Sequence, residues 1–350
     1  MIITMTLCGR PCAGSGLSVR MSCWQPAMAT SAVRMAGRNQ PPRFVFFISS
    51  PSRKRSDPAQ FATLYHFNIS ATVIQRGRTP VRCRRMQSMT SSPSPVSSIA
   101  IDALSLEILQ QQHAELRRPP ASLTKLMTAY TAYDLLAQSG GSWSDTIAID
   151  PRDVHDVADD ETRMGLVPGE SIALGRLLEG LMVVSGNDAA LALARHLAGS
   201  QAAFAQHMNG HARALGLNDT HFISASGITT PGHLSTARDM AMLAAHLLAR
   251  YPDLLAITAQ RSFVHRTLQK GNQNALLGEN GVDGLKTGYT QAAGFCLAAT
   301  ARRSCAGHAL PLRLINVVLG ADSRASRDEQ VRAQLDAGFA IAAAAEAQRV

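Results

Sequence analysis

Ser122-Leu123-Thr124-Lys125 is the most informative stretch of this sequence, because two further short motifs follow it in an order that chance rarely supplies. These are Ser185-Gly186-Asn187 and Lys286-Thr287-Gly288. Alone, each is better explained by local structure, as a helix cap, a turn between helices or the end of a strand. Their order, and their places at a helix start, a turn and a strand, together predict a serine enzyme that uses lysine as its base.

The first motif predicts a nucleophile beside its base. Ser122 and Lys125 are three residues apart at the start of an expected helix over residues 122–138, and therefore share a face. The helix N-terminus supplies partial positive charge and unpaired N–H groups. Burial near Leu123 and Leu126 would lower the pKa of Lys125, so that its neutral amine could take the Ser122 proton during attack on a carbonyl.

The other two motifs predict groups that handle a peptide substrate. A Ser185 hydroxyl close to the lysine could pass a proton to the leaving group, and Asn187 could hold a substrate amide. Lys286 and Thr287 end a strand-like run and offer a cation and a hydroxyl to a carboxylate, while Gly288 leaves room for close approach. A strand edge also binds an extended peptide through main-chain hydrogen bonds.

The charge of the chain is divided unevenly. Residues 1–94 hold 13 of the 34 Lys and Arg residues but one of the 25 Asp and Glu residues, so the remainder is slightly acidic. This basic segment has the Arg-rich, Ser-rich composition of a transit peptide. The alternatives are a nucleic-acid-binding arm, and a disordered extension or sequence ahead of a natural start at Met86 or Met89. We expect the last of these, with residues 95–350 as the catalytic domain and no nucleic-acid partner.

Other classes of protein are excluded by missing signals. The sequence has no apolar run long enough for a transmembrane helix. His207 and His211 are four residues apart, but the stretch between them lacks the glutamate of a metalloprotease helix. Cys296 and Cys305 are the two cysteines after the basic segment, and we expect unpaired thiols. No metal and no cofactor are predicted.

Hydrophobic periodicity predicts an α-rich region over about 140–250 between one early strand and several late ones. We expect an α+β fold in which the early strand joins the late strands in an antiparallel sheet flanked by helices. The predicted helices cover residues 122–138, 174–182, 188–197, 202–215, 236–250 and 326–345. The predicted strands cover residues 97–107, 261–267, 281–289, 294–301 and 312–319.

Residues 97–338 resemble the penicillin-binding D-alanyl-D-alanine carboxypeptidases of bacterial cell-wall metabolism, which carry related motifs. The resemblance implies a β-lactamase/transpeptidase-like fold with an all-α subdomain. It implies that Ser122 is the acylated nucleophile and Lys125 its general base, with Ser185 as proton shuttle. The matching stretches beyond the motifs are Pro120–Thr128, Leu215–Phe222, Ser235–Met240 and Val282–Thr290.

The same resemblance implies how the substrate binds. Asn187 would hold the substrate amide, Lys286 and Thr287 the terminal carboxylate, and the N–H groups of Ser122 and Tyr289 the oxyanion. Two positions depart from the family: Gln273 stands where an arginine is often found, and Tyr289 where a histidine is frequent.

The implied reaction releases the last D-alanine of a peptidoglycan stem peptide through an acyl-enzyme, and penicillins would acylate the same serine. We expect a periplasmic or otherwise extracytoplasmic location and no C-terminal second domain. The alternative is a D-alanyl-D-alanine endopeptidase that cuts cross-links, suggested by Ala292-Ala293-Gly294-Phe295-Cys296-Leu297. A β-lactamase is disfavoured because the Glu-x-x-Leu-Asn loop is missing. A module that only binds penicillin or peptidoglycan is disfavoured because it would not need the base that Lys125 supplies.

Overall fold

The computed structural model describes residues 29–35, 43–49 and 95–348, and the chain divides into two units, Met1–Arg85 and Met86–Val350. In the first unit, strands β1 (Ala29–Met35) and β2 (Arg43–Ser49) pair antiparallel, where we expected no regular structure. The other residues before Pro95 lie outside the described part, so the expectation of a basic leader stays a prediction.

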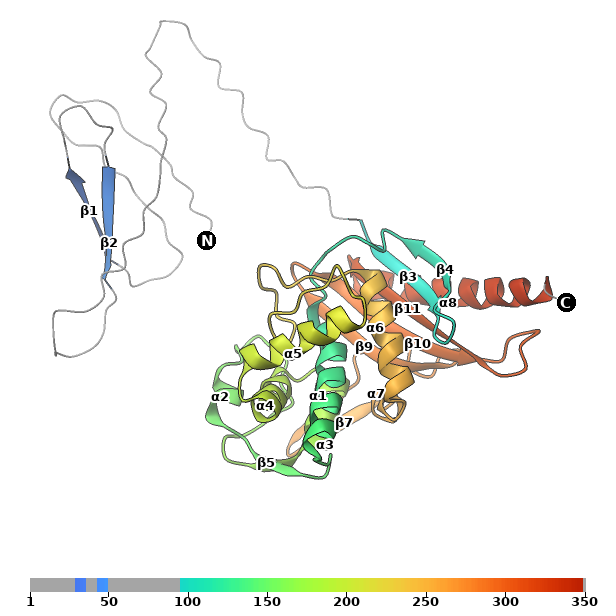
Figure 1. Ribbon diagram of the computed structural model, residues 1–350, viewed down its shortest axis with the longest axis horizontal. Coiled ribbons are helices and arrows are strands. Elements are labelled where there is room, and N and C mark those ends of the chain that lie inside the picture. Colours follow the sequence, from blue (N-terminus) through green and yellow to red (C-terminus); the bar gives the residue numbers. More distant parts are fainter. Residues whose placement is uncertain (1–28, 36–42, 50–94, 349–350) are drawn as a thin grey trace, which may run out of the picture. The chain divides into compact units, whose positions relative to one another are not determined.

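The second unit is built on a five-stranded antiparallel sheet in the order β4-β3-β11-β10-β9 (Figure 1). The early strand β3 pairs with β11, as the sequence predicts. The strands are β3 (Ser97–Asp102), β4 (Ile108–Gln112), β9 (Val282–Thr290), β10 (Gly294–Arg303) and β11 (Leu312–Ala321). Strand β9, which carries the third motif, lies at one edge of this sheet.

Two strand predictions need correction. The strand predicted over 97–107 ends at Asp102, because the Asp102 carboxylate accepts the N–H groups of Leu104 and Ser105 and turns the chain into β4. The strand predicted over 261–267 does not join the central sheet. It forms β7 (Ser262–His265), which pairs with β8 (Leu268–Gly271) in a sheet of its own. A third short pair joins β5 (Thr146–Ala148) to β6 (Ser171–Ala173).

The central sheet is covered on both faces, because successive residues of a strand point to opposite sides. Along β11, Leu314 and Val318 pack in one hydrophobic cluster with Leu335 of helix α8 (Arg324–Ala347). The alternate residues Ile315 and Val317 belong to the larger second cluster, which includes residues of α6 (Ala237–Arg250). The site described below lies on the face of the sheet that α6 covers, where the short 3-10 helix η1 (Ala121–Thr124) packs against β9.

A mainly helical region, which also contains the β5–β6 pair, lies beside the sheet, with α1 packed among α3, α4, α5 and α6 (Figure 1). Helix α1 is buried along most of its length, which explains why its apolar residues are not confined to one stripe. The remaining elements are η1 (Ala121–Thr124), α1 (Lys125–Ser139), α2 (Pro151–His155), α3 (Leu174–Val183), α4 (Asn187–Ala198), α5 (Gln201–Ala214) and α7 (Leu254–Thr258).

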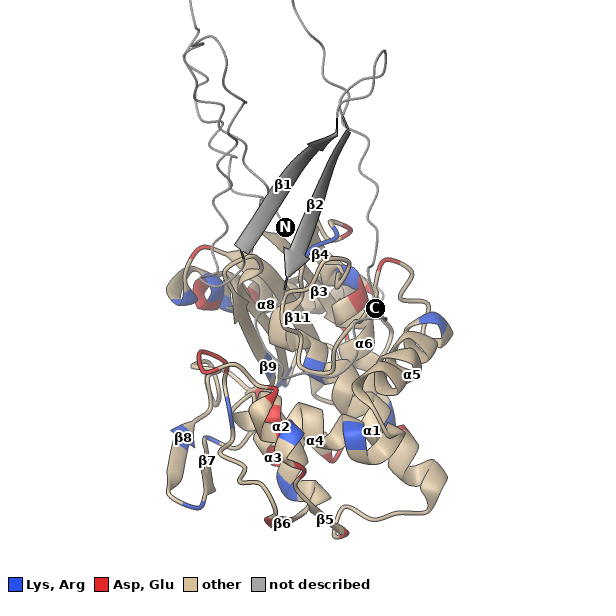
Figure 2. Cartoon of the chain, turned by 90° about the vertical axis from the view of Figure 1, so that its left-hand side faces the viewer, with Lys and Arg blue, Asp and Glu red and all other residues tan. Residues whose placement is uncertain are grey.

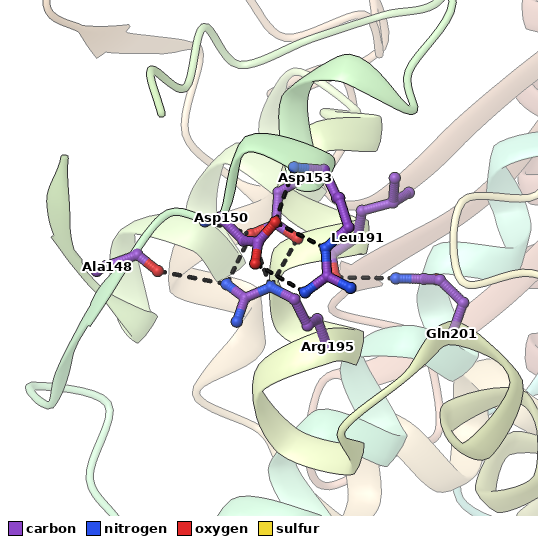
Figure 3. A network of polar contacts seen from close by, with 7 residues as sticks. Ala148, Asp150, Asp153, Leu191, Arg195 and Gln201 are labelled. Carbon is purple, nitrogen blue, oxygen red and sulfur yellow. Dashed lines mark hydrogen bonds and ion pairs between the residues drawn. The ribbon is translucent and has the colours of Figure 1, made fainter. Parts of the chain in front are cut away.

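A buried ion pair ties α2 to α4 (Figure 3). Arg195 donates from Nε to Asp153 Oδ1 over 2.9 Å and from Nη2 to Asp153 Oδ2 over 2.7 Å. Asp153 also accepts the N–H of Asp150, which itself caps α2. Asp153 is only 2% exposed and the Arg195 side chain 24% exposed, so the carboxylate is shielded from water while the guanidinium is partly accessible; the pair holds the C-terminal end of α4.

Along the backbone of the second unit, Lys and Arg positions are interspersed among Asp and Glu positions (Figure 2). None of the helices in the described part of the chain combines the length and apolarity that crossing a bilayer requires.

Candidate active site

Lys125 is the centre of the candidate site. It is fully buried at the start of α1, and its Nζ has three hydrogen-bond acceptors. These are Ser122 Oγ at 3.1 Å, Asn187 Oδ1 at 2.6 Å and the Ser226 carbonyl oxygen at 2.6 Å. The structure therefore brings the first two motifs into direct contact.

The surroundings of Lys125 favour its neutral form. Burial lowers its pKa well below the usual lysine range, and the positive charge of Lys286 lowers the pKa further. The carboxylates of Glu161 and Asp188 act in the opposite direction. A lysine with a lowered pKa offers an unprotonated amine that can accept the proton of the adjacent Ser122 hydroxyl.

Ser122 lies in η1, a short 3-10 helix that leads directly into α1. The segment 224–227 packs beside η1 and the start of α1. Thr128 Oγ1, in the first turn of α1, donates to the Ala225 carbonyl over 2.6 Å. Gly227 has a φ of +85°, and a Cβ there would overlap the Ala121 carbonyl. This close approach places the Ser226 carbonyl at Lys125. Sequence reasoning missed Ser226, since a backbone acceptor has no side-chain signature.

Ser185 and Asn187 lie at the turn between α3 and α4. Ser185 is buried with a left-handed φ of +65°, and it is placed two residues before Asn187, the first residue of α4. Asn187 Nδ2 donates to Glu161 Oε2 over 2.5 Å. Glu161 is a second residue that sequence reasoning missed, because no motif includes it.

The third motif lies on β9 against the nucleophile turn. A Cβ built on Gly288 would be 3.0 Å from the Ser122 backbone nitrogen and 3.0 Å from Leu123 Cδ1, so glycine permits the contact. The exposed ring of Tyr289 packs on Phe295, with ring centroids 4.4 Å apart. The strand edge and the nucleophile are thus neighbours.

Lys286 is a buried cation, and its Nζ donates to the Thr287 carbonyl over 2.9 Å. Burial lowers the pKa of Lys286 to about 7, and the charge of Arg327 on α8 contributes to this shift. Arg327 is itself only 3% exposed. It is a third residue missed from the sequence; it is paired with Asp328, and its charge still acts on Lys286.

The comparisons with known proteins agree with this geometry. A family model described as D-alanyl-D-alanine carboxypeptidase, peptidase S11, matches residues 86–323. The chain belongs to this family. The fold is accordingly the penicillin-binding protein fold, with an antiparallel sheet and flanking helices, as predicted.

Individual members of peptidase S11 are clearly similar. The D-alanyl-D-alanine carboxypeptidase DacA of Escherichia coli K12 is 36% identical over 249 residues, which cover 69% of this chain and 60% of that protein. Penicillin binding protein 5 from Haemophilus influenzae is 33% identical with a TM-score of 0.66, covering 70% of each chain. Penicillin-binding protein D2 from Listeria monocytogenes, solved in its cefotaxime-bound form, is 30% identical with a TM-score of 0.60, covering 69% of this chain and 96% of that one.

Three further features of this peptidase S11 chain bear on the sequence predictions. Gln273, where the family often has an arginine, is exposed. Cys296 is a buried free thiol and Cys305 a half-buried one. Among the described residues, no group of three His, Cys, Asp or Glu side chains could hold a metal ion.

Proposed function

We propose that this chain is a serine-type D-alanyl-D-alanine carboxypeptidase that removes the terminal D-alanine from peptidoglycan stem peptides. Membership of peptidase S11 supports the class of reaction. The single observation that carries the proposal is the 3.1 Å contact between Lys125 Nζ and Ser122 Oγ, inside a pocket that favours the neutral amine.

Acylation would begin with the neutral Lys125 taking the Ser122 hydroxyl proton while Oγ attacks the carbonyl carbon of the penultimate D-alanine. The carbon–nitrogen bond then breaks, and a proton passed through Ser185 reaches the departing D-alanine amine. The N–H groups of Ser122 and Tyr289 would stabilise the oxyanion, a contribution of roughly 3 kcal/mol for each such donor. In the second half-reaction, water attacks the Ser122 ester, releases the shortened peptide and restores the hydroxyl.

Three further residues would bind the substrate. Asn187 would hold a backbone amide of the stem peptide, and Lys286 with Thr287 would hold the terminal carboxylate. Because the pKa of Lys286 is about 7, a bound carboxylate would favour its charged form. Gly288 would let the peptide approach the edge of β9.

β-Lactam antibiotics would acylate Ser122 in place of the substrate and act as covalent inhibitors. Structures of similar proteins in ampicillin- and cefotaxime-bound forms support this part of the proposal. A peptidoglycan substrate would require a periplasmic or otherwise extracytoplasmic location.

The test is labelling of the purified protein with fluorescent penicillin, beside Ser122→Ala. We expect labelling of the wild type and none of the variant; equal labelling of both, or of neither, would contradict the proposal. A second assay compares D-alanine release from a peptide ending in D-Ala-D-Ala with cleavage of a cross-linked dimer. Faster cleavage of the dimer would favour the endopeptidase instead.

A further inference from the structure

Glu161 contacts the candidate site but belongs to none of its three motifs. We propose that Glu161 is a positioning residue: its carboxylate fixes the orientation of the Asn187 amide, and through it the direction in which the Lys125 amine points. This inference rests on the proposed function, because it concerns the same base.

The two ends of the Asn187 amide have different partners. Oδ1 accepts a hydrogen bond from Lys125 Nζ over 2.6 Å, and Nδ2 donates to Glu161 Oε2 over 2.5 Å. An ionised carboxylate can only accept hydrogen bonds. With Glu161 ionised, a flipped amide would place its oxygen against the carboxylate, with no hydrogen between them. Glu161 therefore selects the orientation in which Asn187 presents an acceptor to the lysine.

This orientation matters because the neutral amine has two N–H donors and one lone pair. The Asn187 oxygen and the Ser226 carbonyl, each 2.6 Å from Nζ, engage the two donors. The lone pair is then left for the third neighbour, Ser122 Oγ at 3.1 Å, which is the group that must lose a proton. A flipped Asn187 would instead offer a donor to Nζ and compete with Ser122 for the lone pair.

The backbone that follows Glu161 is firmly attached to α4, the helix that carries Asn187. The Asn187 N–H donates to the Thr162 carbonyl over 2.8 Å. The fully buried Asp188 carboxylate accepts the N–H groups of Met164 at 2.8 Å and Leu166 at 3.1 Å. Glu161 is thus held by the same helix as the amide that it orients, as precise positioning requires.

The same carboxylate charge that orients the amide also acts on the pKa of Lys125, which gives the proposal a second readout. The titratable groups that face Lys125 are Lys286 from β9, Asp188 from α4, Glu161 itself and His233, a neutral imidazole from the segment before α6. Glu161 and Asp188 raise the pKa of Lys125, whereas burial and Lys286 lower it. Removing the Glu161 charge would therefore lower the pKa of Lys125 and extend acylation to lower pH.

The experiment measures the rate of acylation by penicillin as a function of pH for three variants of the full chain. Glu161→Gln keeps a hydrogen-bond acceptor for Asn187 but removes the charge. Glu161→Leu removes both. Asp160→Asn removes one charge from the neighbouring exposed side chain, and solvent screens that charge from the site.

We expect the acid limb of the profile to move to lower pH in both Glu161 variants and to stay in place in Asp160→Asn. At the alkaline plateau, we expect Glu161→Leu to remain slower than wild type by on the order of 10- to 100-fold, because the base is misaligned. Glu161→Gln should recover most of the plateau rate.

A merely structural role would lower the folded fraction, measured by thermal unfolding, without moving the acid limb. An unmoved limb in Glu161→Gln would overturn the proposal even if Glu161→Leu failed to fold, as would a wild-type plateau rate in a folded Glu161→Leu. Failure of the wild type itself to react with penicillin would instead reject the proposed function.

Discussion

The α-carbon of Gly288 on β9 faces the backbone nitrogen of Ser122, at a distance that leaves little room for a methyl group. A Cβ at position 288 would lie 3.0 Å from that nitrogen and 3.2 Å from Ala121 Cβ. This relationship joins the strand edge to the nucleophile turn, and both proposed oxyanion donors lie beside it. The separation of β9 and η1 is therefore set by a glycine.

Gly288→Ala should push η1 away from β9 and misalign the oxyanion donors. We expect the acylation rate by penicillin to fall by on the order of 10-fold, because the neighbours must shift by a fraction of the displacement of about 1 Å that costs about 100-fold in active sites. Overpacking should also lower the free energy of unfolding by about 1–3 kcal/mol. Stopped-flow acylation and urea unfolding measure the two effects, and a wild-type acylation rate would show that the gap does not matter.

Gly227→Ala should destabilise the protein far more than the same change at Gly140. Both glycines have a positive φ, of +85° and +70°, and share the cost of placing alanine there, about 1 kcal/mol. Only at Gly227 would the added Cβ also overlap the Ala121 carbonyl, whereas no atom lies within 4 Å at Gly140. We expect a loss of about 3 kcal/mol or more for Gly227→Ala and about 1 kcal/mol for Gly140→Ala in urea unfolding. Equal losses would contradict this account.

Asp153→Ala should be costly because it leaves Arg195 without its carboxylate inside the α2–α4 contact (Figure 3). Removing one partner of a buried pair typically lowers the free energy of unfolding by about 3 kcal/mol. The matched control is Glu279→Ala, whose pair with Arg332 is about half exposed on both sides. We expect that change to cost less than about 1 kcal/mol. Comparable effects in denaturant unfolding would show that the buried pair has no special importance.

Stability should fall as the pH drops from about 6.5 to about 4, because His233 is buried in its neutral form. Burial, followed by the charges of His221 and Lys125, lowers the pKa of His233 from 6.5 to about 4. Its Nδ1 accepts the Ile223 N–H, so Nε2 carries the proton that it donates to Thr124 Oγ1 over 2.8 Å.

In that pH window the unfolded chain binds the additional proton at His233, so the free energy of unfolding rises with pH. The contribution is on the order of 3 kcal/mol across the window. Urea unfolding at a series of pH values should show it, and His233→Gln should flatten the dependence. An unchanged pH dependence in that variant would remove His233 as the cause.

Much of the architecture could be predicted from local patterns. Periodicity predicts the helix over residues 122–138 and the three late strands, which are β9, β10 and β11 in the structure. The early strand pairs with a late one, as expected. Strand β4 was missed because Ile108–Gln112 is a half-exposed edge strand that ends in three glutamines and does not alternate clearly. The separate β7–β8 pair was missed because alternation indicates a strand but not its partner.

The three motifs, their order and the helix, turn and strand that carry them could all be predicted from the sequence, since each depends on residues adjacent in the chain. The surroundings of the two lysines became visible with the tertiary structure. Lys125 has the Ser226 carbonyl and, behind Asn187, the Glu161 carboxylate, and Lys286 has Arg327. These groups come from segments far apart in sequence, and one of them is main chain. Burial and charge at a site are sums over such neighbours, so they exist only once the chain has folded.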